Sequence, residues 1–261
     1  MEILTSTANA FIKHVRALRQ KKTRTEFGQF LVEGITHVGE AIEANWDIDS
    51  ILYAPDLLTS AFAKDLLARA ERLSLKLQPV SVSVIESLAD KENPQGILAV
   101  VQQKKYTFEN VKSITRAVAL VSPQDPGNLG TTLRTLDAVS ADALFLLEGG
   151  VELYHPTVIR ASMGTLFWKP VLQTSFDEFL NWAHTGGHQL IGTSAKADVD
   201  YHTLVPQTPW VLLLGNEQKG LSPEQIAACD VSISLPMHGR VSSLNLSVAA
   251  GVLLYQYAKP E

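Results

Sequence analysis

Four short, almost entirely apolar segments recur in the second half of the chain, and they limit the possible folds more than any other feature. They are AVALVS at 117–122, ALFLLE at 143–148, HQLIGTS at 188–194 and WVLLLG at 210–215. Apolar runs of this length that alternate with helical patterns are typical of buried strands in a parallel sheet. We therefore predict an α/β domain over residues 117–261.

A second, smaller α/β pattern occupies residues 1–103. Apolar spacing and turn residues predict helices at 7–20, up to residue 42 and at 61–73, and strands at 29–34, 48–53, 75–80 and 96–102. The polar and weakly periodic stretch 104–116 separates the two patterns, and we interpret it as a linker. No nucleophile, paired carboxylate or metal cluster stands out in residues 1–103, which favours a recognition module.

Length and composition indicate a chain that does not cross a membrane. With 261 residues, 46% of them hydrophobic, the chain can bury two moderate cores. The longest apolar runs are shorter than the roughly 20 residues that span a bilayer. The first 20 residues lack the apolar region of a signal peptide, so a cytoplasmic protein is expected. The single cysteine, Cys229, has no partner at disulfide or metal-ligand spacing; we predict a structural role and no metal.

Charge is distributed unevenly along the chain. The net charge of −5 argues against a protein that coats nucleic acid by bulk electrostatics. Between residues 1 and 25, however, Glu2 is the only acid. The basic residues there are Lys13, Arg16, Arg19, Lys21, Lys22 and Arg24. This segment can meet RNA phosphates, with Lys21, Lys22 and Arg24 as candidates, although a solvated helix face explains the charges equally well.

Three blocks rich in glycine and polar residues follow predicted strands: NLGTTLR at 128–134, LGNEQKGLS at 214–222 and LPMHGRVSSLNLSVA at 235–249. The carboxyl ends of parallel strands are the expected place for a ligand site in this fold class. Asn128 is placed to cap a helix, and Gly130 lies four residues before Arg134, so that its missing side chain clears a face for the guanidinium. Asn128 and Arg134 by themselves are a weak signal.

The last block continues into an apolar C-terminal helix. Ser242 or Ser243 can cap it. Small residues fall on one face at Ser243, Ser247 and Gly251, which allows another backbone to approach closely. A second stripe consists of Leu244, Val248, Val252 and Tyr255. An ordinary buried helix fits this pattern, but the polar Ser243 and Asn245 in the first turn favour a site.

In their order along the chain, the three blocks resemble the SpoU/TrmH family of RNA ribose 2′-O-methyltransferases, within the SPOUT class. The pattern N-x-G-x-x-x-R is weak, G-N-E-x-x-G-L is moderate, and P-M-x-G followed by S-L-N-x-S-x-A is strong. RASMG at 160–164 fits a further family block. The segment KKTRTEFGQFLVEG resembles the small ribosomal-protein-like substrate-binding domain that many members carry before the catalytic domain.

The resemblance implies a C-terminal SPOUT domain with a parallel sheet and a deep trefoil knot, an exception to the rule against threaded chains. It also implies that S-adenosylmethionine binds in the knot, largely through backbone groups. The matching cofactor positions here are Leu214, Gly215, Asn216, Leu235, Met237, Leu244 and Asn245. The absence of a G-x-G-x-x-G pattern agrees with a cofactor that is not held as in a Rossmann site.

The family's catalytic arginine corresponds to Arg134, which would also contact RNA. A ribose hydroxyl is a poor nucleophile at neutral pH and needs proton removal or local positive potential. We favour an arginine that holds the hydroxyl and the adjacent phosphate, with action as a base as the alternative. The resemblance further gives Asn128 and Ser243 the task of orienting ribose and arginine, Glu217 that of positioning the loop, and Asn245 that of completing the pocket floor. It also implies a homodimer.

The sequence thus predicts methyl transfer to a ribose 2′-hydroxyl of structured RNA. Ribosomal RNA is favoured over transfer RNA because of the appended N-terminal domain. A transfer RNA enzyme and a noncatalytic RNA-binding protein on the same fold are the alternatives. The missing glycine fingerprint disfavours a nucleotide-dependent oxidoreductase.

Overall fold

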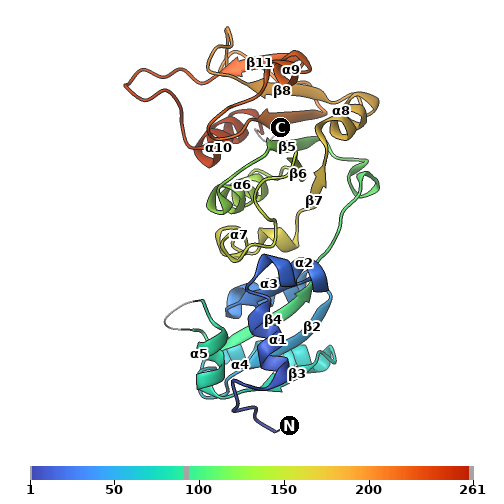
Figure 1. The fold of residues 1–261 in the computed structure, drawn as a ribbon. Helices are drawn as coiled ribbons and strands as arrows, with labels where there is room; N and C mark the ends of the chain where they lie inside the picture. The colour runs from blue at the N-terminus through green and yellow to red at the C-terminus, as the bar shows by residue number, and fades with distance from the viewer. Residues whose placement is uncertain (1, 91–93, 259–261) are drawn as a thin grey trace. The chain divides into compact units, whose positions relative to one another are not determined.

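The computed structural model describes residues 2–90 and 94–258, and the chain divides into two compact units, Met1–Lys104 and Lys105–Glu261 (Figure 1). The predicted domains 1–103 and 117–261 include residues 1, 91–93 and 259–261, which lie outside the described residues. The predicted linker 104–116 is corrected by the packing. This stretch is mostly polar, but it contains four apolar side chains that pack on the core of the second unit: Tyr106, Phe108, Val111 and Ile114.

The first unit contains a four-stranded sheet in the order β1-β4-β2-β3. Strands β1 and β2 pair antiparallel with β4, and β2 pairs parallel with β3. The strands are β1 (Gln29–Glu33), β2 (Ile48–Tyr53), β3 (Leu77–Pro79) and β4 (Ile97–Gln102), and the helices are α1 (Ala10–Ala17), α2 (Lys21–Phe27), α3 (Ile35–Glu43), α4 (Ala61–Arg72) and α5 (Val82–Leu88). The predicted small α/β unit is confirmed, with the basic run forming a helix of its own.

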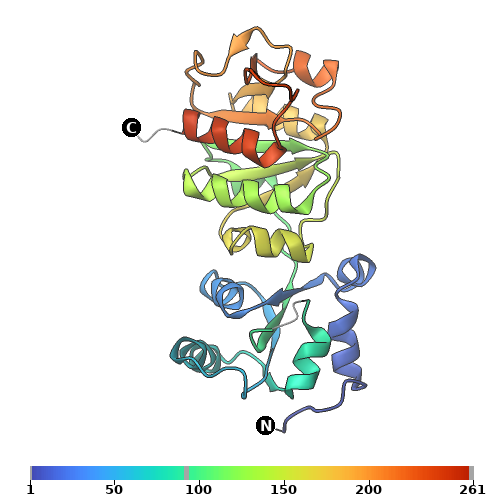
Figure 2. The ribbon, with the colours of Figure 1, turned by 90° about the vertical axis from the view of Figure 1, so that its left-hand side faces the viewer.

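Helices cover both faces of this sheet. Ile12 and Val15 of α1 pack with Ile85 of α5 against one face, together with Leu98 and other apolar side chains of β2 and β4. Helices α3 and α4 contact each other, and α3 also contacts β1 and β4 (Figure 2). Successive side chains of a strand point to opposite faces of the sheet, so apolar residues of these strands are buried under the helices on both faces.

The second unit is built on a seven-stranded sheet in the order β7-β6-β5-β10-β8-β11-β9, and every pairing in it is parallel. Its strands are β5 (Arg116–Val121), β6 (Ala143–Leu147), β7 (Val171–Thr174), β8 (Gln189–Thr193), β9 (Val199–Asp200), β10 (Trp210–Leu214) and β11 (Val231–Ser234). Its helices are α6 (Pro126–Ala138), α7 (Pro156–Ala161), α8 (Phe176–Thr185), α9 (Pro223–Ala227) and α10 (Leu246–Tyr257), with 3-10 turns η1 (Phe108–Val111) and η2 (Thr165–Phe167). The predicted parallel α/β domain is confirmed. The trefoil knot remains a prediction.

Two helices begin at residues other than those predicted. Helix α6 starts at Pro126 and is capped by Asp125, whose carboxylate accepts a hydrogen bond from the Asn128 N–H at 2.8 Å. Asn128 is thereby free to use its side chain elsewhere. Helix α10 is capped by Asn245 and not by Ser242 or Ser243, because the Asn245 amide oxygen accepts the N–H groups of Ser247 and Val248.

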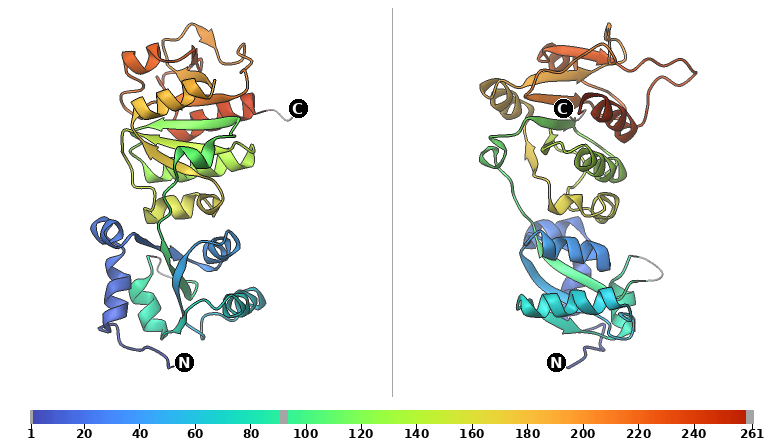
Figure 3. Two further views of the ribbon diagram at one scale, coloured as in Figure 1. Left: turned by 90° about the vertical axis from the view of Figure 1, so that its right-hand side faces the viewer. Right: turned by 180° about the vertical axis from the view of Figure 1, so that it is seen from behind.

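Helices α6, α7 and α10 lie side by side on one face of the large sheet (Figures 2 and 3). Gly130 of α6 makes the close approach of α7 possible: a Cβ there would lie 2.5 Å from the Ala161 Cβ and 2.8 Å from the Val158 carbonyl oxygen. The interpretation that Gly130 clears space for Arg134 is therefore wrong, since α7 fills that space.

Helix α10 has an exposed apolar face. Leu246, Ala250 and Leu253 are buried, whereas Val248 is 50% exposed and Tyr255 is 64% exposed. Gly251 faces α6. A Cβ at this position would lie 3.8 Å from the Thr135 methyl carbon, which is an ordinary van der Waals contact. The small residue at 251 thus lies at the contact with α6, and the stripe of Leu244, Val248, Val252 and Tyr255 is left uncovered.

Among the described residues, no helix is both long and apolar enough to span a membrane.

Cys229 packs near Gly192, and its thiol donates to the Gln225 carbonyl at 3.2 Å. Burial, and after it the charge of Asp230, raise the pKa of Cys229 to about 11. The thiol therefore stays protonated at neutral pH, as expected for a structural cysteine.

Two glycine substitutions in the helix layer should act in opposite directions. Gly130→Ala forces a methyl group against the α7 backbone and should destabilise the second unit by about 1–3 kcal/mol. Gly251→Ala meets only ordinary contacts and should be neutral or stabilising by up to about 1 kcal/mol. Urea denaturation followed by circular dichroism measures both. Equal effects of the two variants would contradict the tight α6–α7 approach.

Candidate active site

Because the strands are parallel, the loops after β5, β10 and β11 all leave from the same edge of the sheet. These loops carry the three blocks that the sequence singled out. β5 and β10 are neighbours although many residues separate them in sequence, so the chain reverses its direction of winding between them. Such a switch point is where α/β sheets open a crevice for ligands.

Glu217, in the loop after β10, binds the loop after β5. Its carboxylate accepts the Gln124 N–H at 3.1 and 3.0 Å, the Asp125 N–H at 3.2 Å and the Asn128 side-chain amide at 3.2 Å. A carboxylate that receives several N–H groups forms strong, charge-assisted hydrogen bonds. Glu217 therefore fixes the start of α6 relative to the end of β10.

Asn128 links Glu217 to the start of α10 through hydrogen bonds. Its side chain is buried, donates to Glu217, and accepts the Asn245 amide at 2.8 Å. The Asn245 oxygen in turn accepts the Ser247 N–H at 2.9 Å and the Ser247 hydroxyl at 2.7 Å. One chain of hydrogen bonds thus joins the three sequence blocks. Asn128 and Asn245 have both ends of their amides engaged in it.

Asn216 is also engaged within the protein. Its side-chain N–H donates to the Ser122 carbonyl at 2.8 Å, and its oxygen accepts the backbone of Gln218 and Lys219 at 3.0 and 3.2 Å. Its own N–H and C=O pair with Gly220. Beside it, a Cβ at Gly215 would lie 2.1 Å from the Gly220 carbonyl carbon, so the closed loop requires glycine there.

The predicted cofactor segments differ in exposure. Leu214 is buried, Leu235 and Met237 are half-buried, and Leu244 is 40% exposed. The backbone N–H and C=O groups of Leu235, Met237 and Leu244 have no backbone partner within residues 2–90 and 94–258. This edge therefore offers free backbone donors and acceptors beside apolar side chains.

Arg134 and Ser243 do not join the hydrogen-bonded chain. Both are exposed, and neither side chain makes a hydrogen bond or ion pair with any other described residue. Arg134 lies in α6, whose start is fixed by Glu217 and Asn128. Its guanidinium is consequently available to a bound molecule.

The sequence reasoning missed the end of β8. β8 lies between β10 and β11, so Thr193 and Ser194 lie between two of the predicted cofactor segments. The Thr193 hydroxyl donates to the Leu213 carbonyl at 3.2 Å, and the Ser194 N–H donates to the Ile233 carbonyl at 2.9 Å. Small hydroxyl residues directly after an apolar strand were the signal that could have found them.

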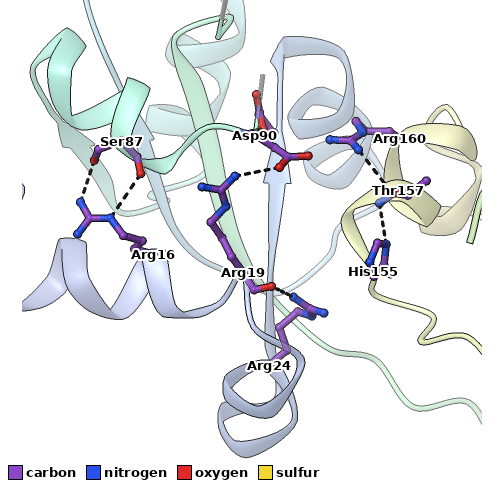
Figure 4. A network of polar contacts seen from close by, with 9 residues as sticks. Arg16, Arg19, Arg24, Ser87, Asp90, His155, Thr157 and Arg160 are labelled. Carbon is purple, nitrogen blue, oxygen red and sulfur yellow. Dashed lines mark hydrogen bonds and ion pairs between the residues drawn. The ribbon is translucent and has the colours of Figure 1, made fainter. Parts of the chain in front are cut away.

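The basic N-terminal segment is only partly available for RNA. Arg24 is 2% exposed and donates to the Leu18 and Arg19 carbonyls at 2.9 and 2.7 Å, so it closes the turn between α1 and α2 (Figure 4). Arg16 donates to Ser87, and Arg19 pairs with Asp90 at 2.9 Å. These contacts join α1 to the end of α5.

The assignment of Arg24 to the RNA contacts is therefore corrected, since its guanidinium is buried on backbone carbonyls. Lys13, Lys21 and Lys22 are exposed.

In the second unit, His155, which had no predicted role, caps α7 by accepting the Thr157 N–H at 3.2 Å (Figure 4).

A cavity of about 630 Å³ lies at the opposite edge of the large sheet, where β5 and β10 begin. Arg116, Trp210, Gln256 and Tyr257 are among its lining residues. None of the three sequence blocks reaches it, so it is separate from the candidate site.

Comparison with known proteins agrees with the fold just described. A family model described as the SpoU rRNA Methylase family matches residues 115–255, and one described as the MRM3-like substrate binding domain matches residues 9–99. The chain belongs to the SpoU rRNA methylase family.

Three similar proteins illustrate the relationship. A 23S rRNA (uridine(2479)-2′-O)-methyltransferase from Streptomyces viridochromogenes is 30% identical over 97% of this chain and 90% of its own length. A 23S rRNA (guanosine(2553)-2′-O)-methyltransferase from Bacillus subtilis is 27% identical over 98% of both chains. The crystal structure of an AdoMet-bound rRNA methyltransferase from Sinorhizobium meliloti has a TM-score of 0.89 at 31% identity, covering 98% of this chain and 96% of that one.

Replacing Glu217 tests the hydrogen-bonded chain. Glu217→Gln puts an amide N–H group among N–H donors and should destabilise the second unit by about 1–3 kcal/mol. Gln218→Ala, next in the same loop but with an exposed side chain, should change stability by less than about 0.5 kcal/mol. Thermal and urea unfolding measure both variants. A Glu217→Gln variant as stable as the wild type would show that the hydrogen bonds of Glu217 contribute little to the stability of the second unit.

Proposed function

We propose that the protein transfers a methyl group from S-adenosylmethionine to a ribose 2′-hydroxyl of ribosomal RNA. The observation that carries this proposal is the convergence of the three family blocks on one sheet edge through Glu217, Asn128 and Asn245. Family membership supports the reaction, and the named activities of the two curated relatives favour 23S rRNA over transfer RNA. An RNA substrate of this kind fits the cytoplasmic location expected from the sequence.

The residues at the edge fit S-adenosylmethionine. Free backbone N–H and C=O groups at Leu235, Met237 and Leu244 match the hydrogen-bonding edge of an adenine, and the apolar side chains there match its ring faces. Leu214 and Gly215 would form the wall on the β10 side. Asn216 and Asn245 would shape this pocket by holding loops, since their amides are engaged within the protein. When bound, the cofactor supplies an electrophilic methyl group on a positively charged sulfur.

The exposed Arg134 side chain would act on the RNA. A guanidinium presents several N–H donors in a fixed fork and keeps its proton at neutral pH. Arg134 would therefore hold the ribose hydroxyl and an adjacent phosphate in line for attack and stabilise negative charge on the oxygen. The exposed hydroxyl of Ser243 would orient the ribose. Glu217, Asn128 and Asn245 would fix the elements that carry these two groups.

Removing the Arg134 guanidinium should abolish methyl transfer. Arg134→Ala is expected to slow the incorporation of labelled methyl groups into RNA by about 100-fold or more. S-adenosylmethionine affinity, measured by calorimetry, should change little. Arg116→Ala, at the opposite edge of the same sheet, is the matched control and should stay active. An active Arg134→Ala enzyme would overturn the assigned role.

We also propose that the protein acts as a homodimer through α10. Leu244, Val248, Val252 and Tyr255 form an uncovered apolar stripe, and such stripes are commonly covered by a partner. A second copy that covers it would approach the exposed loop 235–245 and complete the surroundings of Arg134. The hydrogen bonds that link Glu217, Asn128 and Asn245 form within one copy of the protein and do not depend on the dimer.

A charge placed in the α10 stripe should prevent dimerisation. Val248→Asp would bury an unpaired carboxylate in the proposed interface and should weaken association by at least about tenfold. Light scattering after gel filtration gives the mass of each species. Lys64→Asp, which adds an acid to the exposed surface of α4 in the first unit, is the control. A wild-type monomer at micromolar concentration would refute this part of the proposal.

The first unit would bind RNA through Lys21 and Lys22 at the start of α2. Each phosphate contact contributes about 0.9 to the slope of log affinity against log salt on duplexes and about 0.7 on single strands. The Lys21→Gln, Lys22→Gln double variant should therefore bind RNA more weakly and reduce that slope by about 1–2. Lys64→Gln is the single-lysine control. Unchanged affinity and slope would place the RNA on another surface.

A further inference from the structure

Ser122, the first residue after β5, has an unusual backbone conformation. Its φ is +44°, in the left-handed region that non-glycine residues seldom adopt. Strained residues of this kind persist only where the surrounding contacts hold them, and they are frequent at functional sites. Neither the sequence blocks nor the proposed chemistry has given Ser122 a part.

In this left-handed turn the N–H and hydroxyl of Ser122 reach the end of β6, and its carbonyl faces the loops after β5 and β10. Its N–H donates to the Leu147 carbonyl at 2.8 Å, and its hydroxyl donates to the Glu148 carbonyl at 2.9 Å, both at the end of β6. Its carbonyl accepts the Asn216 side chain at 2.8 Å and the Gln124 side chain at 2.7 Å. Ser122 thus joins the loops that follow β6 and β10 to the loop that follows β5.

Pro123 follows Ser122 and precedes Gln124 and Asp125, whose backbone N–H groups Glu217 binds. Pro123 accepts the Val151 N–H at 2.7 Å, and a Cβ at Gly150 would lie 2.4 Å from the Pro123 carbonyl oxygen. The segment is therefore pressed between the β6 loop and the β10 loop. The Gln124 and Asp125 N–H groups then point to the Glu217 carboxylate.

We propose that Ser122 is a positioning residue for methyl transfer: its hydroxyl holds the β5 loop on the β6 loop so that Glu217 can bind Gln124 and Asp125. This inference rests on the proposed function. It predicts that the reaction depends on the hydroxyl, whereas stability depends mainly on how easily residue 122 adopts a positive φ. Alanine and glycine at position 122 separate the two effects, because both lack the hydroxyl and only glycine favours the left-handed turn.

Ser140 provides a matched control. It too has a positive φ, +56°, and follows the end of α6, but it is exposed and its hydroxyl makes no hydrogen bond with a described residue. Ser140→Gly should raise the thermal midpoint above that of Ser140→Ala, and both variants should keep the wild-type rate of methyl transfer.

The test compares Ser122→Ala and Ser122→Gly with these controls in single-turnover methyl transfer, thermal unfolding and amide hydrogen exchange. Both Ser122 variants should slow methyl transfer by about tenfold or more and speed exchange of the Gln124 and Asp125 amides by about tenfold. The glycine variant should nevertheless have the higher thermal midpoint. Rates within twofold of the wild type, or rates that follow the thermal midpoint, would overturn the role of the hydroxyl.

Hydrogen exchange keeps this test separate from the proposed function. If the wild-type protein transfers no methyl group to RNA, the proposed function fails. The exchange rates of Gln124 and Asp125 then decide alone whether Ser122 positions the loop, and unchanged exchange in both variants would refute that.

Discussion

The carboxylate of Glu217 is the interaction on which the candidate site depends. It collects N–H groups from Gln124, Asp125 and Asn128, and Asn128 extends the connection to Asn245 at the start of α10. Segments more than a hundred residues apart are thereby fixed at one sheet edge. Hydrogen bonds to a charged acceptor in a half-buried place are stronger than neutral ones and hold their geometry better. That rigidity suits a reaction which depends on the alignment of two bound molecules.

The layer of α6, α7 and α10 supports the same edge from one side. Gly130 allows α7 to lie against α6, and α10 packs on the other side of α6, with Gly251 at the contact. The position of α6 then determines where Arg134 projects. What this unit leaves exposed is equally informative: the guanidinium, the loop 235–245 and the apolar stripe of α10 are the parts through which RNA, cofactor and a second copy would act.

Much of this could be predicted from the sequence, because strand hydrophobicity and the order of three blocks are local patterns. The roles inside the site were harder to predict. Asp125 and Asn128 are both good capping residues, and only Pro126 between them indicated that the helix starts earlier. The charge of Arg24 did not reveal that its guanidinium closes a turn. An apolar stripe such as that of α10 does not show whether it faces its own core or another chain.

The side chains that the sequence assigned to catalysis thus fall into two groups. Glu217, Asn128 and Asn245 hold the structure together, and Arg134 and Ser243 remain free to contact a substrate. The most direct measurement of the central claim is mass spectrometry of ribosomal RNA nucleosides from a strain that lacks this protein. We predict that one 2′-O-methyl nucleotide disappears and returns when the gene is restored. An unchanged set of 2′-O-methyl nucleotides would contradict the proposed function.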